Sequence, residues 1–243
     1  MATLVLDIET LGVEWSQLSG LTKQALLQPI ERQAGTEAEK EARRQHVRER
    51  LALSPFTGRI IALALRDVER RHTAVYVVAD AAVRIPDTAA VDKVKVRSEA
   101  ELLEEFWHGA QSYDVFVTFN GRSFTWPFLY YRSLALGIRP SVEVARERYL
   151  TKQTAPYHVD LLEEFSNYGG LTHRPSLALL CGAFTIPHPS VLGGDEVASA
   201  YAAGDLVRII EKAGGDVDTI TALYERWRTH LAPRSFINSV ENL

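Results

Sequence analysis

The sequence has a single cysteine, Cys181, among its 243 residues. It therefore cannot form an internal disulfide, and the apolar, helix-favouring surroundings of Cys181 indicate a small core residue rather than a nucleophile. No apolar run approaches the ~20 residues that a membrane-spanning helix needs. The chain also starts directly with a strand-like segment, without a basic and then apolar leader. These absences predict a soluble protein of a reducing compartment, the cytoplasm.

The chain also has little net charge and no glycine-rich phosphate loop. Its formal net charge of −4 argues against broad electrostatic binding of duplex nucleic acid, although a local basic groove would not show in this sum. The missing loop excludes a structural ATPase or phosphate-binding module. With 46% hydrophobic residues the chain can bury one sizeable core, so we expect a single domain over residues 1–243.

Two carboxylates end the first apolar run, Leu4-Val5-Leu6-Asp7-Ile8-Glu9-Thr10. Side chains two residues apart on a strand point to the same face, so Asp7 and Glu9 would present their oxygens together. Such hard oxygen ligands suit a Mg²⁺ or Mn²⁺ ion that must leave room for a phosphate. The triplet alone is weak evidence, because two solvated acids at the end of a strand would give the same pattern.

Apolar alternation and turn signals predict a mixed α/β fold. Strand-forming runs lie at 59–65 and 73–78, which suggest a hairpin beside the first strand, and at 113–119 and 158–162. Helices are predicted over 126–136, 176–182, 196–203 and 205–228, and one more begins at the capping box Ser98-Glu99-Ala100-Glu101. The segment of about 13–53 favours helix and forms an insertion, and 83–94 is expected to be a loop. Together these elements predict a mixed sheet with helices on both faces.

The junction from Val117 to Leu129, with Val5–Thr10 at the start and Gly204–Val217 near the end, resembles the DEDD (DnaQ-like) superfamily of 3′-5′ exonucleases. The chain is most similar to the predicted exonucleases related to the proofreading domain of family B DNA polymerases. The similarity extends through 53–60, 158–161 and 197–227, so it covers nearly the whole chain. It implies an RNase H-like fold with a five-stranded mixed sheet flanked by helices, in which one strand runs antiparallel to the rest.

In this superfamily four carboxylates hold two divalent ions, and the resemblance gives the chain three of them. Asp7 and Glu9 match the first motif, so Asp7 would bridge both ions and Glu9 would ligate the ion that activates water. Asp216 matches the acid of the third motif. The implied cofactor is Mg²⁺ or Mn²⁺. Taken alone, Asp216 beside Gly214-Gly215 could instead cap a second half of the last helix.

Two positions depart from the motifs of the superfamily. Thr125 stands where the second motif, Asn-Gly-x-x-Phe-Asp, has its aspartate, and a neutral hydroxyl cannot supply the charge that holds the second ion. Lys212 stands where the third motif, Tyr-x-x-x-Asp, has a tyrosine that orients the attacking water. The lysine could touch a phosphate, pair with Glu9 or compete with the metal. Tyr201 to Asp205 also spells the third motif, but choosing it would misplace the helix that follows.

The resemblance also implies substrate contacts. Thr10 and Leu11 lie where the family contacts the 3′-terminal nucleotide and wedges its base, and Asn120 and Phe124 of the second motif belong to the same group. The aromatic residues of the next helix could stack on bases, although such a cluster is more often core; they are Trp126, Phe128, Tyr130 and Tyr131.

Asp160, at the end of a predicted strand, has two interpretations. Its carboxylate could bond to nearby backbone, which is common at strand ends, or it could replace the missing aspartate as a ligand or lie just behind the ligands.

Two functions remain open. One is a metal-dependent 3′-5′ exonuclease that acts on the ends of single-stranded DNA or RNA, with full or reduced activity. The other is a catalytically inactive member of the fold that binds nucleic acid or a partner protein. Retention of Asp7, Glu9 and Asp216 favours the first, because a chain without metal chemistry has no reason to keep a costly cluster of like charges. The changes at Thr125 and Lys212 favour the second.

Overall fold

The computed structural model describes residues 1–86, 88–144, 146–188, 192–194 and 196–242. Within these ranges the chain forms a six-stranded sheet with the order β4-β3-β2-β1-β5-β6. The strands are β1 (Thr3–Gly12), β2 (Gly58–Asp67), β3 (His72–Val78), β4 (Lys93–Arg97), β5 (Val115–Thr118) and β6 (Tyr157–Asp160). The helices are α1 (Gly20–Glu31), α2 (Glu37–Glu49), α3 (Glu99–Ala110), α4 (Thr125–Ala135), α5 (Leu161–Phe165), α6 (Leu177–Phe184), α7 (Val197–Ala202), α8 (Leu206–His230) and α9 (Arg234–Glu241). None of these helices is long and apolar enough to pass through a bilayer.

The mixed α/β architecture is confirmed, with one strand more than the five expected. The strand β2 is antiparallel to β1 and β3, whereas the pairs β1·β5, β5·β6 and β3·β4 are parallel. The additional strand is β4, which begins inside the loop expected at 83–94; residue 87 of that loop lies outside the described residues. The sequence of β4, Lys-Val-Lys-Val-Arg, is short and charged. Charged residues protect an exposed sheet edge from pairing with other chains, and they also make the strand look like a loop.

Two further boundaries differ from the sequence predictions. The strand expected at 158–162 ends at Asp160, because the Asp160 carboxylate accepts a hydrogen bond from the backbone N–H of Leu162 at 3.1 Å and caps α5. The last helix, α9, was not predicted, and it buries Phe236 and Val240 on one face. By contrast, α8 runs unbroken through Gly214-Gly215, so the interpretation of Asp216 as the cap of a second helix is wrong.

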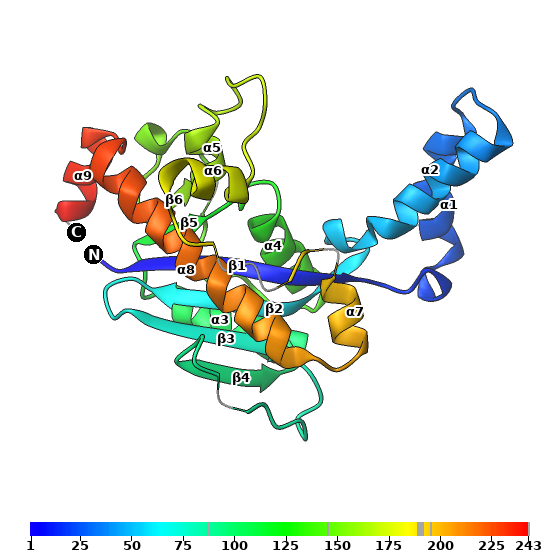
Figure 1. Ribbon diagram of the computed structural model, residues 1–243, viewed down its shortest axis with the longest axis horizontal. Coiled ribbons are helices and arrows are strands. Elements are labelled where there is room, and N and C mark those ends of the chain that lie inside the picture. Colours follow the sequence, from blue (N-terminus) through cyan, green and yellow to red (C-terminus); the bar gives the residue numbers. More distant parts are fainter. Residues whose placement is uncertain (87, 145, 189–191, 195, 243) are drawn as a thin grey trace.

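Helices cover both faces of the sheet (Figure 1). The long helix α8 crosses one face and packs on Val5, Ala62 and Ala64. Helices α3 and α4 cover the other face, where Leu6 and Ile8 of β1 are buried. Because successive side chains of a strand alternate between the two faces, β1 directs its odd-numbered residues toward α8. Asp7 and Glu9 therefore lie between the sheet and α8.

The insertion after β1 forms a helical arm, made of α1 and α2, that extends away from the sheet (Figure 1). Its helical content agrees with the sequence prediction for 13–53, which did not separate the two helices. The guanidinium of Arg44 joins them, because it bonds to Glu31 of α1 at 2.8 Å and to Glu37 of α2 at 2.6 Å. The arm starts where β1 ends, so it is anchored beside the end of the strand that carries Glu9.

The turn between β5 and α4 leaves no room for a side chain at Gly121. A Cβ atom at Gly121 would lie 2.0 Å from Oγ1 of Thr118, which is fully buried. Thr118 cannot easily move, because its hydroxyl shares a 2.8 Å hydrogen bond with Nε2 of His158. Burial lowers the pKa of His158 to about 3, so this imidazole is neutral near pH 7. Glycine is therefore required at position 121 for steric reasons.

We predict that Gly121→Ala lowers the free energy of unfolding by ~1–3 kcal/mol, the usual effect of overpacking a rigid site. The matched control is Gly109→Ala in α3, where an added Cβ meets no atom within 4 Å. That change should leave stability unchanged or raise it by ~0.5–1 kcal/mol, because alanine favours helix more than glycine does. Urea denaturation of both variants measures the difference, and equal stabilities would contradict the steric argument.

Candidate metal centre

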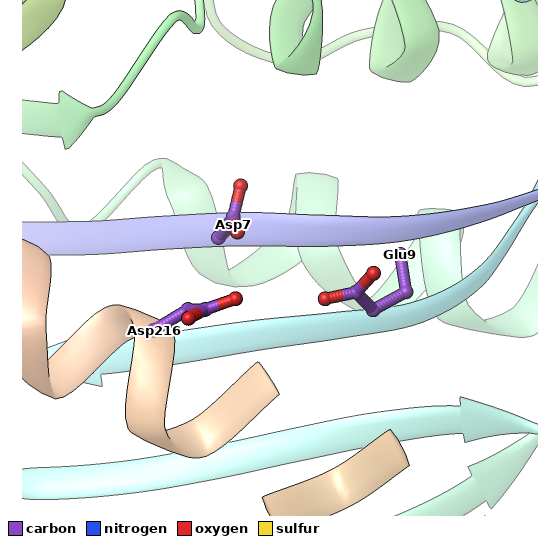
Figure 2. Close-up of side chains that lie close together, drawn as sticks. All are labelled: Asp7, Glu9 and Asp216. Carbon is purple, nitrogen blue, oxygen red and sulfur yellow. The ribbon is translucent and has the colours of Figure 1, made fainter. Parts of the chain in front are cut away.

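Three carboxylates converge between β1 and α8. Asp7 and Glu9 come from β1 and Asp216 comes from α8, and one oxygen of each lies within 4.8 Å of the others. Figure 2 shows the carboxylates of Glu9 and Asp216 pointing toward each other beside Asp7. The strand periodicity accounts for the first two, and the crossing of α8 over the same face brings the third. Residues more than 200 positions apart in the sequence thus form one acidic cluster.

Small residues on the neighbouring strand leave room for this cluster. In the antiparallel register, Asp7 lies opposite Ala64 and Glu9 lies opposite Ala62. Directly opposed side chains on one face are close neighbours, so larger residues there would fill the space that the carboxylates occupy. The register shifts just after Glu9, as at a β-bulge. The sequence analysis overlooked Ala62 and Ala64, although their alternation with Ile and Leu in β2 was a readable signal.

Lys212 is the cation of this site. Its Nζ lies 2.5 Å from Oε1 of Glu9 and 2.6 Å from Oδ2 of Asp216. On α8, Lys212 and Asp216 are four residues apart, so they lie on the same side of the helix. The side chains of Glu9, Lys212 and Asp216 are only 8, 12 and 13% exposed. Of the alternatives that the sequence left open for Lys212, the structure contains the pairing with Glu9.

Burial and mutual repulsion change the acidity of the cluster. Burial, followed by the charges of Glu9 and Asp216, raises the pKa of Asp7 well above its ordinary value. Burial also raises the pKa of Glu9, although Lys212 opposes this shift. Burial disfavours the charge of Lys212, but Glu9 and Asp216 outweigh this effect and raise its pKa. The ammonium therefore stays charged while the acidic cluster carries unfavourable like charge.

Thr125, at the position of the missing aspartate, is the first residue of α4 and is fully buried. Its Oγ1 has no hydrogen-bond partner among the described residues. The strand that leads to it, β5, pairs with β1 over Thr3–Val5, so the chain leaves the sheet just before the level of Asp7. A buried hydroxyl without a hydrogen-bond partner costs free energy. The fold therefore accepts a polar side chain at position 125 although this side chain forms no hydrogen bond among the described residues.

Asp160 bonds to backbone and lies outside the three-carboxylate cluster. It accepts hydrogen bonds from the N–H groups of Asn120 and Arg122, both at 2.9 Å, in addition to that of Leu162. These contacts hold the turn before α4. Burial raises the pKa of Asp160. The geometry agrees with the interpretation of Asp160 as a backbone-bonding residue and gives no support to a replacement ligand.

The predicted substrate contacts lie around this end of the sheet. The hydroxyl of Thr10 donates to the carbonyl oxygen of Ala52 at 2.7 Å. Leu11 lines a hollow of about 350 Å³ between the end of β1 and the base of the helical arm, together with Trp15 and Arg48.

Asn120 and Phe124 of the second motif contact residues that lie outside the motif. Oδ1 of Asn120 accepts a 2.6 Å hydrogen bond from Arg174, a contact across 54 positions that no sequence pattern indicated. Phe124 packs against Phe128 in the core. Among the aromatic residues of α4, Trp126 and Phe128 are buried, whereas Tyr131 is 45% exposed and contacts the ring of exposed Phe56.

The second Tyr-x-x-x-Asp string has structural contacts of its own. The hydroxyl of Tyr201 donates to the carbonyl oxygen of Val78 at 2.9 Å. The carboxylate of Asp205 accepts from the N–H of Arg208 and caps α8. Neither residue belongs to the acidic cluster, so the string and the cluster are separate features of the fold.

A comparison with protein-family models identifies the relatives of this chain. Residues 65–242 match the family described as "Predicted 3'-5' exonuclease related to the exonuclease domain of PolB". The chain belongs to this family. The match includes Thr125, Lys212 and Asp216 and begins after Asp7 and Glu9. The family match therefore does not include Asp7 and Glu9, and it is the structure that places them beside Asp216. No curated protein matches the chain.

A solved structure shares the fold of this chain. The family B DNA polymerase from the hyperthermophilic archaeon Pyrobaculum calidifontis matches with a TM-score of 0.57 and 15% sequence identity. The match covers 93% of this chain and 24% of the polymerase, so the chain spans about a quarter of that protein's length. This similarity confirms the RNase H-like fold expected for a member of this exonuclease family.

We predict that Asp7→Asn raises the free energy of unfolding of the metal-free protein by ~1 kcal/mol at pH 7, because it removes one of three repelling charges. The folded-state pKa of Asp7 is raised. Below the unfolded-state pKa the Asp7 carboxyl is protonated in both states and does not destabilise the fold. As the pH rises through the folded-state pKa, the carboxylate ionises and its repulsion lowers the free energy of unfolding. The gain should therefore shrink toward pH 4.

Urea denaturation with chelator present, at pH 7 and near pH 4, measures this effect. The control is Glu225→Gln, which removes a carboxylate on the exposed side of α8. A loss of stability in the Asp7→Asn variant at pH 7 would contradict the repulsion.

Proposed function

We propose that this protein is a metal-dependent 3′-5′ exonuclease that acts on the ends of single-stranded nucleic acid. The observation that carries the proposal is the convergence of Asp7, Glu9 and Asp216 within 4.8 Å of one another. Membership of a family of predicted exonucleases supports the reaction type. The substrate, a single-stranded DNA or RNA 3′ end, is part of the proposal.

The donor set fits a divalent cation of the Mg²⁺ or Mn²⁺ type. Three carboxylates from two rigid elements supply hard oxygen ligands, and Lys212 is bonded to only two of them, Glu9 and Asp216. We propose Asp7, Glu9 and Asp216 as the residues that would hold the ion. When bound, a divalent ion activates water and stabilises charge on a phosphate. Because Thr125 carries no charge, the chain retains ligands for one ion rather than two.

The remaining residues of the proposed site would position the strand. Thr10 and Leu11 follow Glu9 directly, so a nucleotide that contacts them would place its phosphate near the carboxylates. Ala62 and Ala64, which lie opposite Glu9 and Asp7, are small enough to leave room for the carboxylates. The hydroxyl of Thr10 is already bonded to Ala52, which fixes the orientation of the backbone at the end of β1.

A second candidate is a protein that binds single-stranded ends or a partner protein without cleaving them. Two observations favour it. Thr125 is a buried neutral residue at the position of the second-motif aspartate, and the ammonium of Lys212 already neutralises part of the cluster. Loss of one ligand and addition of one cation would each weaken metal binding.

One experiment separates the two candidates. A 3′-protected and an unprotected strand, each 5′-labelled and each supplied as DNA and as RNA, are incubated with the protein in Mn²⁺ or in chelator. The exonuclease should shorten the unprotected strand only in Mn²⁺, and Asp7→Asn should abolish this reaction. Binding of the strand without shortening in Mn²⁺ would favour the second candidate.

We predict that Thr125→Asp raises the rate of degradation by ~10²-fold or more, the scale on which one charge-stabilising group acts. The buried position would carry an unpaired charge without an ion, so the variant should be less stable in chelator and gain more stability in Mn²⁺ than the wild type. Thr125→Asn, similar in size but neutral, is the control. A folded Thr125→Asp variant with an unchanged rate would show that the missing aspartate does not limit the reaction.

A further inference from the structure

The unusual feature of the cluster is that a side chain of the protein already provides a cation. Lys212 is in contact with two of the three acids, Glu9 at 2.5 Å and Asp216 at 2.6 Å. Charge-assisted N–H···O hydrogen bonds are usually about 2.7–2.9 Å long, so the contact is tight. The ammonium bonds to these two residues, and Asp7 forms no ion pair within the part of the chain that the structure describes.

We propose that Lys212 is a tethered cation that occupies the site in the absence of metal and must leave Glu9 and Asp216 when a divalent ion binds there. This inference rests on the proposed metal site. It assigns to Lys212 control of metal affinity, which neither the family match nor the fold match describes.

The first argument is the sharing of ligand atoms. A Mg²⁺ ion bonds to carboxylate oxygens at about 2.0–2.1 Å, so an ion held by Oε1 of Glu9 and Oδ2 of Asp216 would lie next to the present position of Nζ. Two cations in one nearly buried space repel strongly, because little water screens them. The lysine and the ion therefore compete for these oxygens.

The second argument is the position of Lys212 on its helix. Its Cα is fixed in the N-terminal part of α8, whereas its side chain has four rotatable carbon–carbon bonds and is 12% exposed. The ammonium can thus move outward without any change in the helix. Asp7, to which Lys212 is not bonded, is the ligand available to an entering ion before the lysine is displaced.

The third argument concerns the metal-free protein. Three closely spaced carboxylates without a counterion would repel one another, and Lys212 relieves this repulsion at Glu9 and Asp216. The same ion pairs that stabilise the empty cluster should lower its affinity for metal. Removal of Lys212 should therefore destabilise the metal-free protein and strengthen metal binding.

The test compares Mn²⁺ binding by chelator-treated wild type, Lys212→Met and Lys152→Met, measured by calorimetry without nucleic acid. Lys152→Met removes the same charge from an exposed lysine. We expect Lys212→Met to bind Mn²⁺ at least ~10-fold more tightly than the wild type, whereas the control should be unchanged. An unchanged affinity of a folded Lys212→Met variant would overturn the proposal.

A second measurement distinguishes release of the lysine from a simple effect of its charge. Amine acetylation followed by mass spectrometry reports the reactivity of each lysine. Lys212 should react slowly in chelator and several-fold faster in saturating Mn²⁺, while Lys152 should react equally in both. Persistent protection of Lys212 in Mn²⁺-bound protein would overturn its release.

These outcomes do not depend on the exonuclease reaction. A protein that shows the expected affinities and lysine reactivity but degrades no strand would keep the tethered cation and lose the proposed activity. An active nuclease whose Lys212→Met variant binds Mn²⁺ no more tightly would keep the activity and lose the tethered cation. Absence of Mn²⁺ binding in the wild type and the variant alike would overturn both.

Discussion

The ion pairs of Lys212 with Glu9 and Asp216 make the centre of this molecule possible. They join the N-terminal half of α8 to β1 through a space that is almost closed to water. Without a cation there, three carboxylates would meet under a helix that packs on the sheet mainly through apolar side chains, with Asp218 of α8 paired to Arg66 of β2. The same ion pairs affect two properties of the protein. They stabilise the fold around the acidic cluster, and they compete with a metal ion for the carboxylate oxygens.

The changes at Thr125 and Lys212 act on the same electrostatic balance. An aspartate at position 125 would add a buried negative charge, and a tyrosine at position 212 would remove the positive one. This chain has neither, so its cluster carries less negative charge than the pattern of the superfamily implies. We infer that such a cluster binds metal more weakly than a four-carboxylate site would.

Sequence reasoning found the parts of the site that follow from local periodicity. The spacing of Asp7 and Glu9 on a strand fixed their shared face, and the order of the motifs identified Asp216 on the last long helix. It did not predict that Lys212 bonds to both acids, because this depends on how α8 crosses β1. It also missed β4, because this strand is short and three of its five residues are basic. The contact of Arg174 with Asn120 was not predicted either, because it joins distant segments. A local sequence pattern predicts helices, strands and the faces that their side chains share. Contacts between these elements can be found only when their packing is known.

The central claim, that Asp7, Glu9 and Asp216 form a site for one divalent ion, is tested most directly by anomalous diffraction from a crystal of the protein soaked in Mn²⁺. The account predicts a single strong anomalous peak in contact with Asp7 and Asp216, with Glu9 as a direct or water-mediated ligand and the Lys212 ammonium moved away. No peak at these three carboxylates, or two fully occupied peaks, would contradict it.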